Sequence, residues 1–114
     1  MSWTAIPDSA WVDAVATPVN MVANTSYIAD AGALQTFNVP ALAAQGTVFE
    51  IAGNNGGNFI VQMNAGQTAH LASAATSAGG TLTATNQYDQ IKLLCTVANT
   101  TFTVIGAIGT FVSA

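Results

Sequence analysis

The sequence predicts an all-β domain, an antiparallel sandwich or jelly-roll-like fold or a barrel, preceded by a short N-terminal arm. From Val19 onward, short runs rich in Val, Ile, Phe, Thr and Tyr alternate apolar with polar residues. Gly, Asn and Pro separate these runs at intervals of about ten residues, as in sandwiches and barrels. A chain of 114 residues is long enough for one domain with its own core and too short for two comfortable ones.

We expect residues 1–18 to form the arm and residues 19–114 the β-sandwich domain. The arm contains both tryptophans, two of the three prolines and two of the five acidic residues. Its stretch "DSAWVDAVA" suits a short helix that Asp8 caps. In that helix Trp11, Val12 and Val15 share one side.

Eight strands are expected in the domain. They lie within residues 33–39, 47–53, 58–63, 67–71, 80–84, 88–97, 101–107 and 109–113. The alternation places four groups of residues on common faces: Gln35, Phe37 and Val39; Phe49 and Ile51; Ile91, Leu93, Cys95 and Val97; and the opposing Val48 and Glu50. Pro40 ends the first of these strands because proline cannot donate to a sheet ladder.

Two glycine-containing segments predict turns rather than chemistry. "GNNGG", Gly53 to Gly57, is expected to be a hairpin tip, since Asn and Gly tolerate positive φ. It resembles a phosphate loop only in its glycine content, because no lysine follows it. "NAGQ", Asn64 to Gln67, also needs only a turn, with the Gln67 amide available at the start of the next strand.

The charge content excludes several classes of function. Six formal charges, one of them Lys92 and the only basic one, give a net charge of −4. Spread over about 5,800 Å² of surface, this is about one charge per 1,000 Å². Such a surface protects poorly against association, so we expect much of it to be buried between copies or in an assembly. A single basic residue excludes nucleic-acid binding and argues against anionic membranes.

Three segments together resemble a module of bacteriophage tail-fibre, spike and head-decoration proteins. They are "MVANTSYIADAGALQTFNVPALAAQGTVFEIAG", "IVQMNAGQTAHL" and "TATNQYDQIKLLCTVANTTFTV", and the likeness extends over residues 19–112. The matching residues are Tyr27, Gly32, Phe37, Pro40, Asn64, Ala65, Gly66, Gln67, Tyr88, Asp89, Val97, Ala98, Asn99, Thr100 and Phe102. Thr47 stands where the family has Asp, and Phe59 lies near its usual Trp.

The resemblance implies a β-rich, trimeric virion component made in the cytoplasm of the host bacterium. The amino end shows no secretory signal, which agrees with that site of synthesis. We expect a capsid decoration, or cement, protein that trimerises and binds the major capsid protein or another virion protein. The alternative is a tail-fibre or spike module that contacts a glycan or protein of the host surface, because the module is reused in several virion parts.

Each function would use its own contact residues. For docking, the large apolar residues of the arm are the candidates: Trp3, Ile6, Trp11, Val12 and Val15. The alternative arrangement is that the arm adds an edge strand or helix to its own domain. For contact with the host surface, the candidates are Asn54, Asn55 and Tyr27.

No enzyme, cofactor or metal is expected. His70 lacks a second histidine, a nucleophile or a metal-ligand spacing nearby, and it is expected to be structural. The lone Cys95 is interpreted as a small core residue. Asp30 and Asp89 are not gathered at calcium-ligand spacing. Tyr88 and Asp89 instead suggest a buried corner in which the phenol and the carboxylate bond to backbone.

Overall fold

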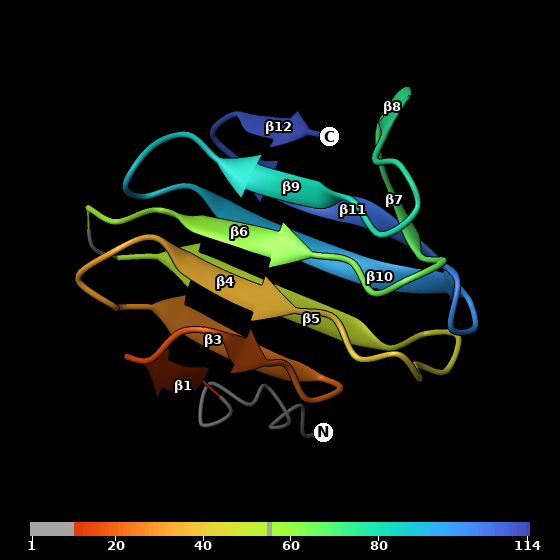
Figure 1. The fold of residues 1–114 in the computed structure, drawn as a ribbon, viewed down its shortest axis with the longest axis horizontal. Helices are drawn as coiled ribbons and strands as arrows, with labels where there is room; N and C mark the ends of the chain where they lie inside the picture. Colours follow the sequence, from red (N-terminus) through yellow and green to blue (C-terminus); the bar gives the residue numbers. More distant parts are fainter. Residues whose placement is uncertain (1–10, 55) are drawn as a thin grey trace, which may run out of the picture.

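The computed structural model describes residues 11–54 and 56–114, which form two β-sheets packed face to face and no helix (Figure 1). The seven-stranded sheet contains, in spatial order, β1 (Trp11–Ala14), β3 (Thr25–Ala29), β5 (Val48–Gly53), β10 (Gln90–Val97), β11 (Thr101–Ile108), β7 (Thr68–Leu71) and β8 (Ala74–Ala75). The five-stranded sheet contains β12 (Phe111–Ser113), β9 (Thr81–Ala84), β6 (Phe59–Gln62), β4 (Gln35–Asn38) and β2 (Val19–Asn20). The predicted all-β sandwich is confirmed.

The pairing within the sheets is mixed, whereas the sequence predicted antiparallel strands. From β1 to β7 the chain places successive strands in alternate sheets, so every second strand returns to the same sheet in the same direction. Consequently β1, β3 and β5 are parallel neighbours, as are β2, β4 and β6. Parallel strands need a long crossover, which is usually a helix. Here a strand of the opposite sheet serves as that crossover.

Four strands and one crossing differ from the sequence-based expectations. β1, β2, β3 and β8 were not predicted, and the helix expected over residues 8–16 is wrong in its described part, where Trp11–Ala14 is a strand. The "GNNGG" segment is not a hairpin tip, because β5 and β6 belong to different sheets and the segment joins them. Gly57 is required there, since a Cβ would overlap the backbone of Ala33.

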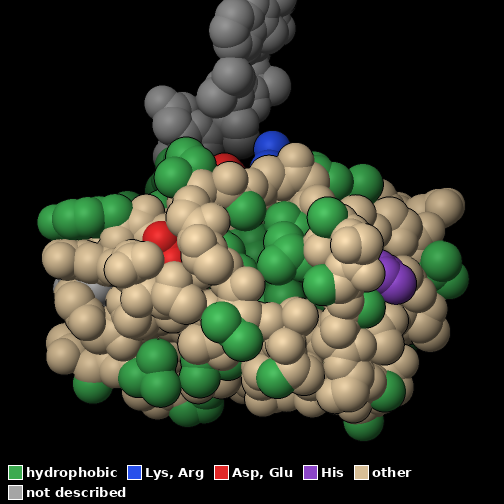
Figure 2. All heavy atoms as spheres, turned by 90° about the horizontal axis from the view of Figure 1, so that it is seen from above, with side chains coloured by type: hydrophobic (Ala, Val, Ile, Leu, Met, Phe, Trp, Pro, Cys, Tyr) green, Lys and Arg blue, Asp and Glu red, His purple; other side chains and the backbone are tan. Residues whose placement is uncertain are grey.

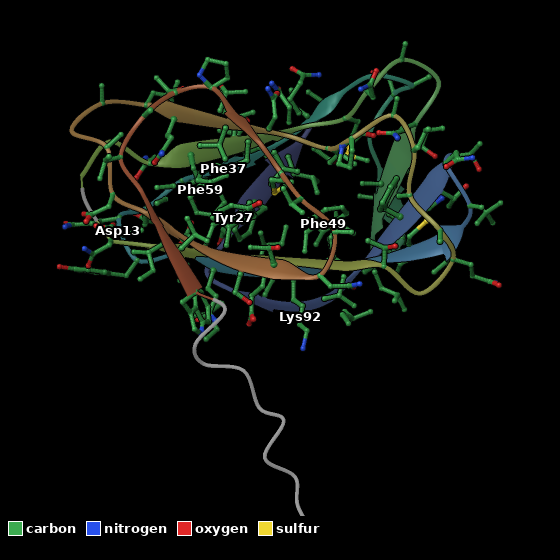
Figure 3. All side chains as sticks on the ribbon, turned by 90° about the horizontal axis from the view of Figure 1, so that it is seen from below. Asp13, Tyr27, Phe37, Phe49, Phe59 and Lys92 are labelled. Atoms are coloured by element: carbon green, nitrogen blue, oxygen red, sulfur yellow. The ribbon has the colours of Figure 1, made fainter. Side chains whose placement is uncertain are left out.

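The core lies between the sheets, and the predicted alternation places its side chains. Gln35, Phe37, Phe49 and Ile51 are all buried, as their shared faces predicted. Aromatic rings connect the two layers: the centroids of Tyr27 and Phe37 are 5.8 Å apart. Figure 3 shows these rings with Phe59 between the sheets, while Lys92 points away from them. Such ring pairs add about 0.5–1.5 kcal/mol beyond the area that they bury.

A buried glutamine holds two of the inter-sheet crossings in place. The Gln35 amide nitrogen donates to the carbonyl oxygens of Ala14 and Ala16, at 2.9 and 2.7 Å, in the β1–β2 crossing. Its amide oxygen accepts the backbone N–H of Ala31, at 3.3 Å, in the β3–β4 crossing. Because Gln35 is buried, these backbone groups are satisfied where water does not reach them.

A second glutamine does the same at the other end of the sandwich. Gln67 donates to the carbonyl oxygen of Pro40 at 2.8 Å and accepts the backbone N–H of Asn64 at 2.8 Å. The predicted turn at "NAGQ" is confirmed by the bond from the Gln67 backbone N–H to the Asn64 carbonyl oxygen, at 3.0 Å. The Gln67 side chain therefore links the β6–β7 turn to the β4–β5 crossing by hydrogen bonds.

We expect Phe37→Ala to lower the free energy of unfolding by about 3–5 kcal/mol, because it leaves a cavity where three rings meet. Phe37 is fully buried and contacts both Tyr27 and Phe59. Leu42→Ala is the matched control, since this side chain is 80% exposed, and it should change stability by less than about 0.5 kcal/mol. Urea unfolding measures both; equal losses would contradict the assigned core.

Candidate functional site

Residues 11–18 of the predicted arm belong to the sandwich. Trp11–Ala14 pairs in parallel with Ser26–Ala29 as the outermost strand of the larger sheet. The Thr17 hydroxyl accepts the backbone N–H of Thr36, at 3.0 Å. The arrangement in which the arm adds an edge strand to its own domain therefore holds for this part.

Of the five predicted docking residues, three are described. Val12 and Val15 are exposed, at 44% and 66%, and Trp11 is partly exposed. These three residues thus present apolar surface at one edge of the sandwich, although on a strand and the loop after it rather than on a helix. Trp3 and Ile6 lie outside the described residues.

The three residues predicted to contact the host surface do not form one site. Tyr27 is buried, which makes its prediction wrong: its ring packs on Phe37, and its hydroxyl accepts the Val22 backbone N–H at 2.7 Å. Asn54 is exposed and donates to the Asp30 carboxylate at 3.0 Å. Asn55 lies outside the described residues. An inward position in the strand alternation was the signal that Tyr27 is a core residue.

Two acidic side chains meet at the edge formed by β1. The neighbouring Asp30 raises the pKa of Asp13 above its ordinary value of 3.8, chiefly through side-chain hydrogen bonding, with desolvation and charge repulsion acting in the same direction. Asp13 is fully exposed, and Figure 3 places it at the periphery of the sandwich. Repulsion between the two carboxylates therefore opposes the ionisation of Asp13 at this edge.

The buried corner predicted at Tyr88 and Asp89 is confirmed for Asp89 and wrong for Tyr88. Asp89 is buried, and one carboxylate oxygen accepts the backbone N–H groups of Thr85 and Asn86, at 2.9 and 3.0 Å. Gly109 packs so closely that a Cβ there would overlap the Asp89 carboxylate. Tyr88, in contrast, is 68% exposed, so its phenol is not part of a buried corner.

The remaining reactive side chains lie apart from one another. His70 is exposed on β7 opposite Thr103 and Ala75. Cys95 is buried in the core, and its thiol contacts the carbonyl oxygens of Ala43 and Val97, which confirms the core interpretation. Among residues 11–54 and 56–114, no three His, Cys, Asp or Glu side chains gather as a metal site.

Apolar side chains and an open strand edge lie on the surface. Beyond Thr103, β11 has β10 on one side and no strand of the described chain on the other. Ile105 and Ile108 on this stretch, and Val112 on β12, are at least half exposed. Figure 2 shows the side on which β12 and β8 lie: hydrophobic side chains gather in a hollow, and charged groups are few. Exposed strand edges of this kind favour association with another chain.

Two features of the structure were not predicted from the sequence. Gln35 and Gln67 were predicted to lie in strands. The hydrogen bonds from their buried amides to the backbone of the crossing segments were not predicted. Their signal is a polar residue on the inward face of an alternating strand. The open edge of β11 at Ile105 and Ile108 has no such signal, because the length of β11 that is paired depends on where β7 ends.

Comparisons with known proteins add no relative. No family model matches the chain, and no curated protein sequence matches it. The part of the chain that the structure describes also contains no helix with the length and apolar character needed to cross a membrane.

We expect the contribution of Asp13 to stability to decrease as pH rises from below 3.8 through its raised pKa. The folded state binds the Asp13 proton more tightly than the unfolded state does, so stabilisation is complete below the unfolded pKa and is lost above the folded one. Thermal melts of wild type and Asp13→Asn across this range measure the effect. The wild type should show the steeper decline, and identical slopes would contradict the pairing with Asp30.

Asp89→Ala should destabilise the domain by about 2 kcal/mol or more, because two backbone N–H groups near the core lose their acceptor. Asn86→Ala serves as the control: its exposed amide bonds only to the Thr85 hydroxyl, at 3.2 Å, and its loss should cost less than about 0.5 kcal/mol. Denaturant unfolding of the two variants gives the comparison. A loss for Asp89→Ala no larger than the control's would contradict the corner.

Proposed function

We propose that the protein is a structural component of a bacteriophage virion, a capsid decoration or cement protein. In this proposal it forms a homotrimer and binds the major capsid protein or another virion protein. It thereby stabilises the shell by burying surface across neighbouring subunits. The proposal includes no catalytic step and no nucleic-acid or membrane partner, and it places the mature protein in the virion.

The observation that carries the proposal is the nature of the exposed surface. The sequence has only six formal charges, and the described sandwich exposes Ile105, Ile108 and Val112 beside an unpaired length of β11. A free monomer with such an edge is prone to associate. Burial between protomers and against a shell removes that apolar surface from water, at about 25 cal/mol for each Å².

The resemblance to phage head-decoration and fibre modules supports the same proposal. Several of the matching residues have structural roles in the sandwich. Phe37 is central to the core, the Gln67 side chain donates a hydrogen bond to Pro40, and the Asp89 carboxylate accepts the backbone N–H of Thr85. The resemblance therefore rests on residues that specify the fold. The choice of decoration rather than fibre rests on the compact domain and its association-prone surface.

The alternative, a tail-fibre or spike module that contacts the host through Tyr27, Asn54 and Asn55, has less support. Tyr27 is part of the core and cannot stack on a ligand without unfolding the β2–β3 crossing. Asn54 remains an exposed amide bonded to Asp30. We therefore favour decoration, in which Trp3 and Ile6 of the N-terminal segment are proposed to dock on the shell.

Sedimentation of the purified protein at micromolar concentration tests the trimer, and we expect a trimeric mass. Ile105→Lys combined with Ile108→Lys should shift it to monomer, because charges then line the open edge. Val22→Lys combined with Leu42→Lys is the matched control, since both side chains are exposed elsewhere. A monomer at every concentration would overturn the trimer.

Binding to capsids stripped of the native protein tests the decoration role separately. The wild type should bind at saturable sites. A variant lacking residues 2–10 keeps all the strands of the described sandwich, so it should still melt cooperatively, and it should bind at least tenfold more weakly. Binding to tail fibres but not to capsids would replace this proposal with its alternative.

A further inference from the structure

A groove of about 690 Å³ lies where β2, β4 and β6 end, on the smaller sheet. Four amide side chains line it: Asn20, Asn38, Gln62 and Asn64. The other lining residues are small or apolar, and none carries a charge. Its size is within the range of roughly 300–1,000 Å³ found for small-molecule sites. None of the functions considered above uses this groove.

Three of the amides form one row across the sheet. Asn20 is the register partner of Asn38, and Asn38 is the register partner of Gln62, in parallel pairs. Register partners in adjacent strands lie about 4.8 Å apart, and their side chains point to the same face. The strand pairing therefore holds three amides at a regular spacing, so a ligand would meet them already in position.

The hydrogen bonds already made within the row leave defined groups for a ligand. The Asn38 amide nitrogen donates to the Asn20 amide oxygen at 3.1 Å. The Gln62 amide nitrogen donates to the carbonyl oxygens of Met63 and Gly79, both at 2.9 Å. Among residues 11–54 and 56–114, no partner is found for the Asn20 amide nitrogen, a donor, or for the amide oxygens of Asn38 and Gln62, which are acceptors.

We propose that this groove binds a neutral saccharide. Hydroxyl groups both donate and accept, so they match a row that offers a donor beside two acceptors. The absence of charged lining residues disfavours phosphorylated, sulfated or acidic sugars, which would lose water without gaining a counter-charge. Partly exposed Pro40 adds an apolar contact for the C–H face of a sugar ring.

The proposal goes beyond the decoration function and does not depend on it. A saccharide site gives the protein a second partner, bound on a sheet separate from the open β11 edge. Its test uses purified protein and needs neither capsid nor trimer. Failure of either proposal therefore leaves the other unaffected.

The test begins with a printed array of neutral, sialylated and sulfated oligosaccharides, on which we expect binding to the neutral ones. The strongest binder is then titrated into isotopically labelled protein. We expect saturable NMR shifts in the side-chain amide signals of Asn20, Asn38 and Gln62. No binding of any neutral oligosaccharide up to 10 mM, or shifts confined to other residues, would overturn the proposal.

Variants provide the second arm of the test. Asn20→Ala and the double variant with Asn38→Ala should weaken binding at least tenfold. Asn86→Ala is the matched control, because it removes an exposed amide that does not line the groove. Asn20 is itself exposed, so its single variant should fold as the wild type does. Unchanged affinity in a folded Asn20→Ala variant, or preferential capture of an unstructured neutral peptide, would contradict the saccharide site.

Discussion

The structure depends on neutral side chains that satisfy backbone groups where the chain crosses from one sheet to the other. Each crossing interrupts the strand ladders, and an unsatisfied backbone group near the core costs about 1–3 kcal/mol. Gln35 and Gln67 supply the missing bonds from the interior. Asn24 and Asn99 supply them nearer the surface, by accepting the backbone N–H groups of Val48 and Ala43, at 3.0 and 2.7 Å.

This requirement accounts for the unusual composition of the chain. An amide both donates and accepts, so one buried Gln serves carbonyl oxygens and an N–H group together without the desolvation cost of a charge. Among the described residues, no buried side-chain nitrogen or oxygen lacks a hydrogen-bond partner. Asp89 is the informative exception, because its carboxylate accepts two backbone N–H groups and therefore tolerates burial.

The alternation of successive strands between the two sheets explains which features the sequence predicts and which it does not. Alternation within a strand is local, and it correctly places Phe37, Phe49 and Cys95 in the core. Strand direction is a long-range property. Without helices, antiparallel pairing was the natural expectation, yet in the first half of the chain the crossovers between parallel neighbours are strands of the opposite sheet. Trp11 was assigned to a helix for a related reason, since its strand exists only through pairing with β3. The amide groove likewise arises from the register of strands distant in sequence.

Neutral polar residues also determine how the outside of the sandwich interacts. With few charges to oppose contact, specificity for a partner has to come from shape, strand edges and ordered hydrogen-bonding groups. The two sheets divide these features: the larger exposes the unpaired length of β11 with its apolar side chains, and the smaller carries the row formed by Asn20, Asn38 and Gln62. Because the open edge belongs to β11 and the amide row to β2, β4 and β6, substitutions can alter one surface without changing the residues of the other.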